Sequence, residues 1–257
     1  MLQTKVKLEP ISHKYYDVEG NQYMSISGVL NLIKPLFERD KLSAMVANKA
    51  GVSQESVLAD WTNTAKRATD HGTRIHESIE YFQNTATIRQ GEEDLEGMIR
   101  SICETYNEYG KVMQEECLFD DEYRIAGTAD KILQVTNHKA SKFDIEDYKT
   151  NMSKGIVTFD KYGKHLLHPM EHMESCNFNT YALQLSFYAF MLERMTGRKV
   201  RQMHITFIPP NNYMNWKKIP VPYLKTDVIN ILNFYKSSIL NKVNETTAVE
   251  QDKEPNF

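Results

Sequence analysis

The stretch Lys142-Phe-Asp-Ile-Glu-Asp-Tyr-Lys-Thr150 is the part of the chain from which the fold can be predicted. It is short, rich in β-forming residues and flanked by Asn, His, Lys and Ser, which is typical of a β-strand. Because side chains alternate between the faces of a strand, Asp147 and Lys149 share one face, about 6.6 Å apart at ~3.3 Å per residue. An acid and an amine at this spacing can hold a metal ion and position a water molecule. An ordinary edge strand with a solvated ion pair has the same pattern.

The preceding segment, residues 123–135, predicts a second strand of the same sheet. Gly127 within it allows a backbone or a ligand to approach closely. If the two strands pair in antiparallel fashion, Asp130 lies across from Asp147. Two carboxylates and a lysine on one sheet face form a hard-oxygen site for Mg²⁺ or Mn²⁺. Two carboxylates without a metal would repel each other, so the pattern favours a bound cation.

Four short motifs together resemble those of a known enzyme superfamily. Gly127-Thr-Ala-Asp130, followed by Asp147-Tyr-Lys149-Thr150, resembles motifs II and III of the PD-(D/E)XK nucleases, in their RecB-like branch. Upstream, Gly72-Thr-Arg-Ile-His76-Glu77 resembles the first motif of that branch, and downstream Gln184-Leu-Ser-Phe-Tyr188 is similar to its Gln-xxx-Tyr helix. Each motif alone is weak, whereas four in this order make a specific resemblance that spans about half the chain.

The outer segments extend this resemblance to a subset of the superfamily. Residues 23–30, 61–76 and 169–188 resemble phage exonucleases and the mitochondrial genome maintenance exonuclease. Related nucleases with an iron–sulfur cluster need four cysteines. This chain has three scattered ones, so we expect no such cluster.

The resemblance implies an α+β fold with a restriction-endonuclease-like core, in which helices flank a central mixed β-sheet. We expect a single nuclease domain over residues 1–244, followed by a flexible tail over residues 245–257. Within this domain, an N-terminal hairpin and a largely helical region occupy residues 1–71, and the catalytic core occupies residues 72–244. No repeat and no Gly/Ser/Pro linker divides the chain.

Hydrophobic periodicity and turn residues predict the remaining elements. We expect a β-hairpin over residues 13–24 and further strands over 200–208 and 215–221. Ser53 and Ser56 offer caps for a helix that Gly72 would interrupt, and Gly197 is a natural helix end. The predicted helices cover residues 28–33, 41–50, 53–82, 91–111, 181–195 and 226–241.

The family resemblance implies a role for each motif residue. His76 would bind the metal through an imidazole nitrogen, which favours Mn²⁺ relative to an all-oxygen site. Asp130 and Asp147 would be the carboxylate ligands, and the backbone carbonyl of Tyr148 would complete the set. Lys149 would orient or deprotonate the attacking water and stabilise the charge that develops on the phosphate.

Further polar residues extend the predicted site. Gln184 and Tyr188 are four residues apart and therefore share a helix face, from which they would contact DNA, with Thr150 assisting. Glu80 lies one turn after His76 and could reach a second metal, and Glu116 is an acid that some relatives use. For both glutamates a solvated charge is the simpler interpretation.

Another group of residues suggests zinc and is better explained otherwise. Three of them lie at spacings of four, but Pro169 would interrupt a continuous helix there. They would also form a stripe about 12 Å long, too long for one tetrahedral ion. The group is His165, His168, His172 and Cys176. We expect a loop near the active site, with basic side chains available to DNA phosphates at Lys154, Lys161 and Lys164.

Composition excludes several classes of protein. The 257 residues are 41% hydrophobic and 25% charged, near the globular average, which excludes a disordered chain, a collagen and a coiled-coil rod. Apolar runs are far shorter than the ~18 residues of a membrane span, and no secretory leader opens the sequence. We therefore expect a cytoplasmic protein, in the host cytoplasm if it is phage-encoded. A net charge of −3 excludes a uniformly basic surface but allows a local basic groove.

We therefore predict a metal-dependent DNA exonuclease that uses Mg²⁺ or Mn²⁺ and processes ends in recombination, repair or replication of a phage or bacterial replicon. The expected partner is single-stranded or end-containing DNA, together with a recombinase, helicase or single-strand-binding protein, and no membrane. Trp61, Lys66 and Arg67 could belong to a helical arch that threads a single strand. The alternatives are a structure- or sequence-specific endonuclease and a catalytically silent DNA-binding subunit.

Overall fold

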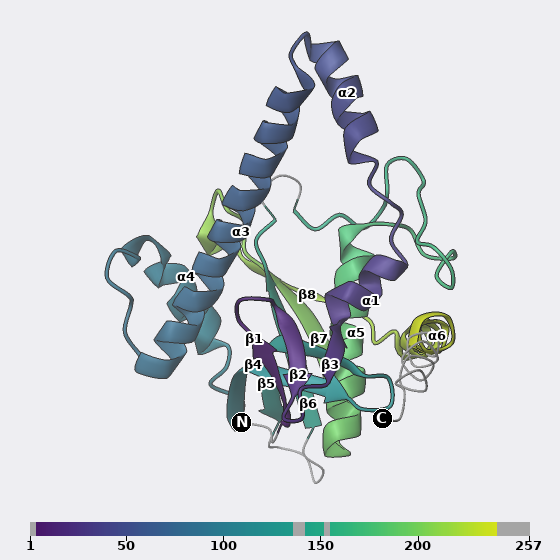
Figure 1. The fold of residues 1–257 in the computed structure, drawn as a ribbon. Coiled ribbons are helices and arrows are strands. Elements are labelled where there is room, and N and C mark those ends of the chain that lie inside the picture. The colour runs from purple at the N-terminus through teal and green to yellow at the C-terminus, as the bar shows by residue number, and fades with distance from the viewer. Residues whose placement is uncertain (1–3, 136–141, 152–154, 241–257) are drawn as a thin grey trace, which may run out of the picture.

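The computed structural model describes residues 4–135, 142–151 and 155–240. The predicted tail over residues 245–257 and Lys154 lie outside the described residues. The fold is α+β, as predicted, with a mixed sheet of eight strands flanked by helices (Figure 1). None of the helices over the described residues combines the length and the apolar character that a membrane span requires.

The sheet has the strand order β1-β2-β3-β5-β6-β7-β8, with β4 paired to β5. Neighbouring strands are antiparallel except for the pairs β3–β5 and β6–β7, which are parallel. The strands are β1 (Val6–Glu9), β2 (Lys14–Asp17), β3 (Gln22–Ser25), β4 (Lys111–Asp120), β5 (Ile125–Val135), β6 (Lys142–Lys149), β7 (Val200–Phe207) and β8 (Lys217–Pro220). The predicted hairpin is β2–β3, whereas β1 and β4 were not predicted.

A fork in the sheet at β5 positions the candidate site. β4 pairs along one edge of β5 over nearly its whole length. The opposite edge pairs with β3 at its first two residues and with β6 only from Lys131 onward. In this register, residues 127–130 lie between the two partner strands. Asp130 therefore stands in the fork, beside the end of β6 that carries Asp147.

Six α-helices surround the sheet. They are α1 (Ile26–Leu32), α2 (Arg39–Ala50), α3 (Gln54–Thr85), α4 (Glu96–Glu104), α5 (Asn177–Thr196) and α6 (Lys225–Tyr235) over the described residues. Short 3₁₀ turns cover Glu93–Leu95 and Tyr213–Asn215, and a π turn, Lys236–Leu240, follows α6. In Figure 1, α2 and the first half of α3 form a hairpin that extends away from the sheet.

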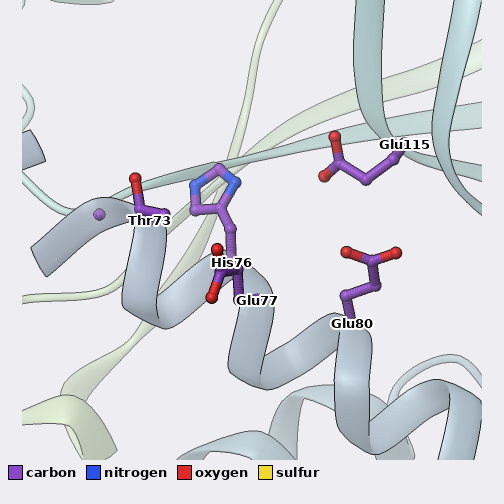
Figure 2. Close-up of a pocket in the computed structure, with 6 residues that line it drawn as sticks. Thr73, His76, Glu77, Glu80 and Glu115 are labelled. Carbon is purple, nitrogen blue, oxygen red and sulfur yellow. The ribbon is translucent and has the colours of Figure 1, made fainter. Parts of the chain in front are cut away.

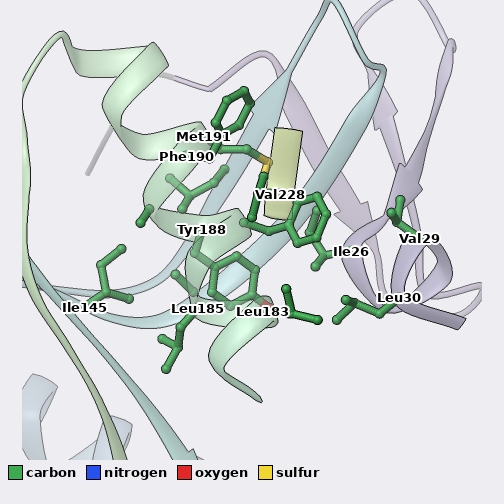
Figure 3. Packing of buried hydrophobic residues seen from close by; sticks show 14 of the residues in the cluster. Ile26, Val29, Leu30, Ile145, Leu183, Leu185, Tyr188, Phe190, Met191 and Val228 are labelled. Atoms are coloured by element: carbon green, nitrogen blue, oxygen red, sulfur yellow. The ribbon is translucent and has the colours of Figure 1, made fainter. Parts of the chain in front are cut away.

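One face of the sheet packs against α5, in which residues 185–192 are all buried (Figure 3). Leu183, Leu185 and Phe187 are fully buried, and Ile145 of β6 belongs to the same cluster. Burying each such side chain contributes about 1.5–3 kcal/mol. This core fixes β6 against α5 and so holds the end of β6 in place.

The opposite face of the sheet packs against α3 and α4. Ile75 and Ile79 of α3, together with Met98 of α4, form a second buried cluster with Tyr148 of β6. Tyr148 alternates with Asp147 along the strand and so points to the other face. The two cores therefore hold β6 from both sides, and α3 is packed directly behind the site.

Local signals in the sequence begin or end several helices, and those at Ser53 and Gly197 were predicted. The Ser25 hydroxyl accepts the Gly28 N–H at 3.0 Å and begins α1, and the Ser53 hydroxyl accepts the Ser56 N–H at 3.2 Å and begins α3. Gly197 ends α5 with φ of +68°, a left-handed conformation that costs a glycine little.

The predicted helix over residues 91–111 is wrong in its second half. The helix ends at Glu104, and β4 begins at Lys111. Tyr106 and Tyr109 have helical spacing but belong to the turns that connect helix and strand. Both hydroxyls donate to buried acids of β6, Tyr106 to Glu146 at 2.9 Å and Tyr109 to Asp144 at 3.0 Å. Tertiary hydrogen bonds, rather than helix propensity, decide this segment.

Gly72 was predicted to interrupt a helix, and this prediction is wrong as well. α3 runs unbroken from Gln54 to Thr85. A Cβ atom at position 72 would lie 3.3 Å from the Thr150 hydroxyl oxygen, closer than ordinary van der Waals contact. The glycine therefore serves a close approach of α3 to the end of β6.

Candidate metal centre

The candidate site lies where α3 passes the fork between β5 and β6. His76 of α3 reaches both strands, with Nδ1 3.5 Å from Oδ2 of Asp130 and Nε2 3.2 Å from the carbonyl oxygen of Tyr148. The same Asp130 oxygen accepts the backbone N–H of Tyr148 at 2.8 Å. The Asp130 side chain thus bridges β5 and the end of β6. Three residues that were predicted as metal ligands, His76, Asp130 and Tyr148, therefore lie together.

The register of the two strands agrees with the predicted pairing. Lys131 lies opposite Glu146, so Asp130 and Asp147 are at the next position along the antiparallel pair. Asp147 is 2% exposed and forms an ion pair with Lys149. The Nζ atom of Lys149 also lies 4.9 Å from the ring centroid of Tyr181 on α5. The aromatic ring and the carboxylate together fix the lysine.

The two charged groups of this pair have shifted pKa values. Burial raises the pKa of Asp147 to about 6, and the charge of Asp130 adds to that effect while Lys149 opposes it. For Lys149, burial lowers the pKa, but the charges of Asp147 and Asp130 outweigh burial and raise it. The lysine is therefore held as an ammonium group near neutral pH.

Glu115 of β4 is a site residue that the sequence prediction missed. One ligand atom from each of His76, Glu115 and Asp130 can be chosen so that the three lie within 4.8 Å of one another. Desolvation, followed by the charges of Asp130 and Glu80, raises the pKa of Glu115 to about 8. The acid weighed from sequence was its neighbour Glu116, which is buried and alternates to the other face of the strand.

A signal for Glu115 is present in the sequence once β4 is recognised as a strand. Gln114 pairs with Lys131 and Glu116 pairs with Ala129, so Glu115 falls opposite Asp130. The φ of Glu115 is +47°, a rare conformation for this residue type. Such strained positions are concentrated at functional sites. Because the segment was assigned to a helix, this pairing could not be foreseen.

A pocket of about 330 Å³ lies along α3, and three glutamates face it (Figure 2). It is lined by Gly72, Thr73, His76, Glu77, Glu80 and Glu115. Glu77 forms an ion pair with Arg89 at 3.2 Å. Glu80 lines the pocket beside the metal cluster, where its charge acts on Glu115. The sequence favoured a solvated charge at Glu80 over a ligand of a second metal, and both interpretations stay predictions.

A second pocket, also of about 330 Å³, adjoins the first at His76. Lys149, Thr150 and Asn151 line it from the end of β6, and Ala68 lines it from α3. Thr150 is thus close to the catalytic candidates, and its assistance in DNA contact remains a prediction. His76 lines both pockets, and we refer to the pair, which lies along α3 beside the glutamates and Lys149, as the track.

Gln184 and Tyr188 share a helix face, as predicted, but lie in a different place. The Gln184 amide donates to the Tyr188 hydroxyl at 2.9 Å, and Tyr188 is only 5% exposed. A ring carbon of Tyr188 lies 2.8 Å from where a Cβ at Gly127 would be, so this glycine accommodates the tyrosine. Both residues line a separate pocket of about 210 Å³ that also includes Ser25. Their contact with DNA remains a prediction.

A buried cation behind the site was also not predicted. Lys131 is 1% exposed, and its Nζ atom donates to Gln83 and Gln114. Burial lowers the pKa of Lys131 to about 8, while its own charge opposes the rise of the Glu115 pKa. This lysine partly offsets the acidic cluster from the opposite side of the sheet.

The residues that suggested zinc make separate contacts. His168 pairs with Glu171 at 3.1 Å and His172 pairs with Asp227 at 3.3 Å. Cys176 is buried at the beginning of α5. Within the described residues, the metal-ligand cluster found is the one at His76.

No family model matches the sequence, and no curated protein matches it at a significant level. Among solved structures, the chain is similar to a candidate exonuclease from Eubacterium rectale, with a TM-score of 0.41 and 12% identity over 87% of this chain and 82% of that one. It is also similar to the protein SSO0001, with a TM-score of 0.37 and 14% identity over 82% and 73% of the two chains. Both likenesses are distant, and the functional assignment rests on the residues of this chain.

Proposed function

We propose that this protein is a divalent-metal-dependent nuclease that hydrolyses DNA phosphodiester bonds from a free strand end. The observation that carries the proposal is the convergence of His76, Asp130, Asp147 and Lys149 at the fork between β5 and β6. Acids, an imidazole and a fixed ammonium group beside an open track suit hydrolysis of a charged phosphate ester.

The donor set fits a hard divalent cation. Carboxylate and carbonyl oxygens with one imidazole nitrogen suit Mg²⁺ or Mn²⁺ better than soft metals. The raised pKa values of Asp147, about 6, and Glu115, about 8, show that these carboxylates are costly to ionise together in the metal-free protein. A bound cation would offset that cost, and it would supply Lewis-acid polarisation of the phosphate and a lowered pKa for the attacking water.

The side chains of the site orient the reacting groups and neutralise charge on the phosphate. Asp130 accepts the Tyr148 N–H and so fixes the strand end whose carbonyl oxygen points to His76. Lys149, held as an ammonium between Asp147 and the Tyr181 ring, is suited to orient a water molecule and stabilise charge on the phosphate. Its raised pKa favours this role over removal of a proton.

The requirement for a free end rests on the resemblance of the flanking segments to phage exonucleases. The same resemblance supports the proposed biological role, which is end processing in recombination, repair or replication of a phage or bacterial replicon. A recombinase, helicase or single-strand-binding protein is the partner that such a setting implies. An endonuclease would use the same residues, so the substrate's topology is the discriminating variable.

The test is a gel assay with Mg²⁺ or Mn²⁺ on end-labelled linear single-stranded DNA and on a closed single-stranded circle. We expect cleavage of the linear strand only, its loss in EDTA, and a drop of at least about 100-fold with Lys149→Ala. Lys199→Ala is the matched control, because Lys199 precedes β7 at the opposite end of the β6–β7 pair and is exposed. We expect it to cleave like the wild type.

The other outcomes are equally informative. Cleavage of the circle would replace the exonuclease with an endonuclease. Metal binding without hydrolysis of linear or circular single strands or of duplex DNA would favour the silent DNA-binding subunit. Equal activity of Lys149→Ala and the wild type would refute the assignment of the site.

A further inference from the structure

A pocket of about 600 Å³ lies beyond the end of β6, outside the metal centre. Phe159, Lys161 and Tyr162 line it from the loop that leads to α5, Asn151 lines it from the end of β6, and Asn177 lines it from the beginning of α5. Pockets of about 300–1,000 Å³ are typical of sites for small organic groups. Of the roles described above, the predicted contact of Lys161 with DNA phosphates alone involves this pocket, so its occupant has to be inferred from its walls.

The pocket is connected to the candidate catalytic lysine. Asn151 lines both this pocket and the track that contains Lys149. The Tyr181 hydroxyl donates to Oδ1 of Asn151 at 3.0 Å, and the same tyrosine ring lies beside the Lys149 ammonium. A strand with one phosphate at Lys149 would therefore bring its adjacent nucleotide to the mouth of the pocket.

The inner wall of the pocket is held in place. Asn151 and Asn177 both donate to the carbonyl oxygen of Gly155, at 3.1 and 2.9 Å. Oδ1 of Asn177 accepts the Val157 N–H at 2.7 Å. These bonds tie the beginning of the loop to α5, so the wall is formed without a ligand.

The rim presents aromatic rings to solvent on a braced turn. Phe159 is 59% exposed and Tyr162 is 73% exposed. The turn itself is fixed, since Asp160 accepts the N–H groups of Tyr162 and Lys164, and Glu174 accepts the N–H of Asp160. Because the turn is fixed, its backbone loses little further entropy when a flat partner stacks on these rings.

The charge beside these rings favours a strand of nucleic acid. The Lys161 ammonium lies 4.6 Å from the centroid of the Tyr162 ring, and Lys149 lies at the other end of the connection. Aromatic rings interleaved with cations are the pattern by which proteins bind single strands, because bases stack on the rings while cations follow the phosphates.

We infer that this pocket receives one unpaired nucleobase of the DNA strand whose phosphate lies at Lys149, stacked against Phe159 and Tyr162. The inference rests on the proposed nuclease function and adds a subsite to it. Because stacking tolerates any base, the subsite favours unpaired over paired nucleotides rather than one sequence. The pocket thus selects single-stranded DNA next to the cleaved bond.

The test combines protein variants with a DNA strand that lacks single bases. Affinity is measured by fluorescence anisotropy in Ca²⁺, under conditions in which no cleavage occurs, with oligonucleotides that carry one abasic site at successive positions. For the wild type, we expect one position at which the abasic site lowers the affinity about 5- to 20-fold. The double variant Phe159→Ala/Tyr162→Ala should lose a similar factor with the intact strand and lose nothing further at that position.

Two controls keep the result specific. Phe159→Trp retains a stacking ring and should keep the affinity, with a tryptophan emission that DNA quenches. Ile11→Ala removes a side chain that is 92% exposed on the distant β1–β2 turn and should bind like the wild type. Thermal melting of each variant checks the fold.

The failures are distinguishable. Suppose that the wild type binds and cleaves DNA. If the double variant then has the same affinity, or still loses affinity at the abasic position, the subsite is refuted and the nuclease function stands. A wild type that neither binds nor cleaves linear, circular or duplex DNA overturns the nuclease and the subsite together.

Discussion

Glu115 shows how one backbone conformation can create a site residue. Its φ of +47° lies in the left-handed region, where residues other than glycine are uncommon. Its neighbours in β4 keep their register with β5 on either side. The strain is thus confined to one residue, whose carboxylate joins His76 and Asp130.

Replacing Glu115 with glutamine should weaken Mn²⁺ binding by about tenfold or more, because a charged donor atom is lost while the shape is kept. The matched control is Glu77→Gln, which changes the same pocket wall at a residue already paired with Arg89. Isothermal titration calorimetry with Mn²⁺ measures both. Equal affinity of Glu115→Gln and the wild type would remove Glu115 from the ligand set.

Among the elements, β5 and α5 depend on each other through a glycine. Gly127 faces Tyr188 and Ile26, and a Cβ atom there would lie 2.8 and 3.0 Å from their carbons. Both neighbours are buried in the same core (Figure 3). Neither can move without disturbing the packing of α5 or α1 on the sheet.

Gly127→Ala should therefore lower the free energy of unfolding by about 1–3 kcal/mol, as expected for overpacking. Gly97→Ala in α4 is the control, because its nearest neighbour is the flexible, exposed Met214 and alanine favours the helix. Urea denaturation gives both values. Adding Tyr188→Leu to Gly127→Ala should recover part of the loss, and an unchanged midpoint for Gly127→Ala would show that the contact is not tight.

Elements with strong local signals were predictable, and those fixed by distant partners were not. The Ser25 and Ser53 caps and the Gly197 end act within one turn, so α1, α3 and α5 could be predicted from the sequence. β4 could not, since Tyr106 and Tyr109 continue a helical spacing and are diverted by acids about 35–40 residues away in the chain.

At the scale of the whole molecule, side-chain alternation together with an assumed antiparallel pairing of β5 and β6 was enough to place Asp130 across from Asp147. β4 was not recognised as a strand, and so the position of Glu115 opposite Asp130 was missed. The fork at residues 127–130 requires three strands to meet on β5. Such a meeting depends on the complete topology, which local patterns do not contain.

The acidic cluster should make the stability of the whole protein depend on pH and metal together. Asp147 and Glu115 have folded-state pKa values of about 6 and about 8, above their ordinary values. The folded protein therefore binds these protons more tightly than the unfolded chain, and their stabilising contribution is lost as the pH rises through 6 and 8. Metal binding requires the deprotonated forms, so its benefit should grow over the same range.

Thermal melting at pH 5, 6, 7 and 8, with EDTA or with Mn²⁺, measures this dependence. At pH 8, Mn²⁺ at about 100 times its dissociation constant should raise the free energy of unfolding by ~2.7 kcal/mol, which is on the order of 5–10 °C in Tm. The same Mn²⁺ concentration should raise it much less at pH 5. Asp147→Asn should reduce the gain at pH 8. A metal-induced shift that is the same at every pH would show that these carboxylates do not bind the ion.

The unbroken course of α3 gives the molecule a mechanical property. His76 is 22 positions beyond the first residue of a helix that begins at Gln54, so about 33 Å of rigid rod separate the imidazole from the tip of the hairpin. A rotation of about 5° around His76 would sweep that tip through ~3 Å over this length. The helix is therefore a long arm that pivots at the metal ligand, and a spectroscopic label at the tip would report rotation of α3 around His76.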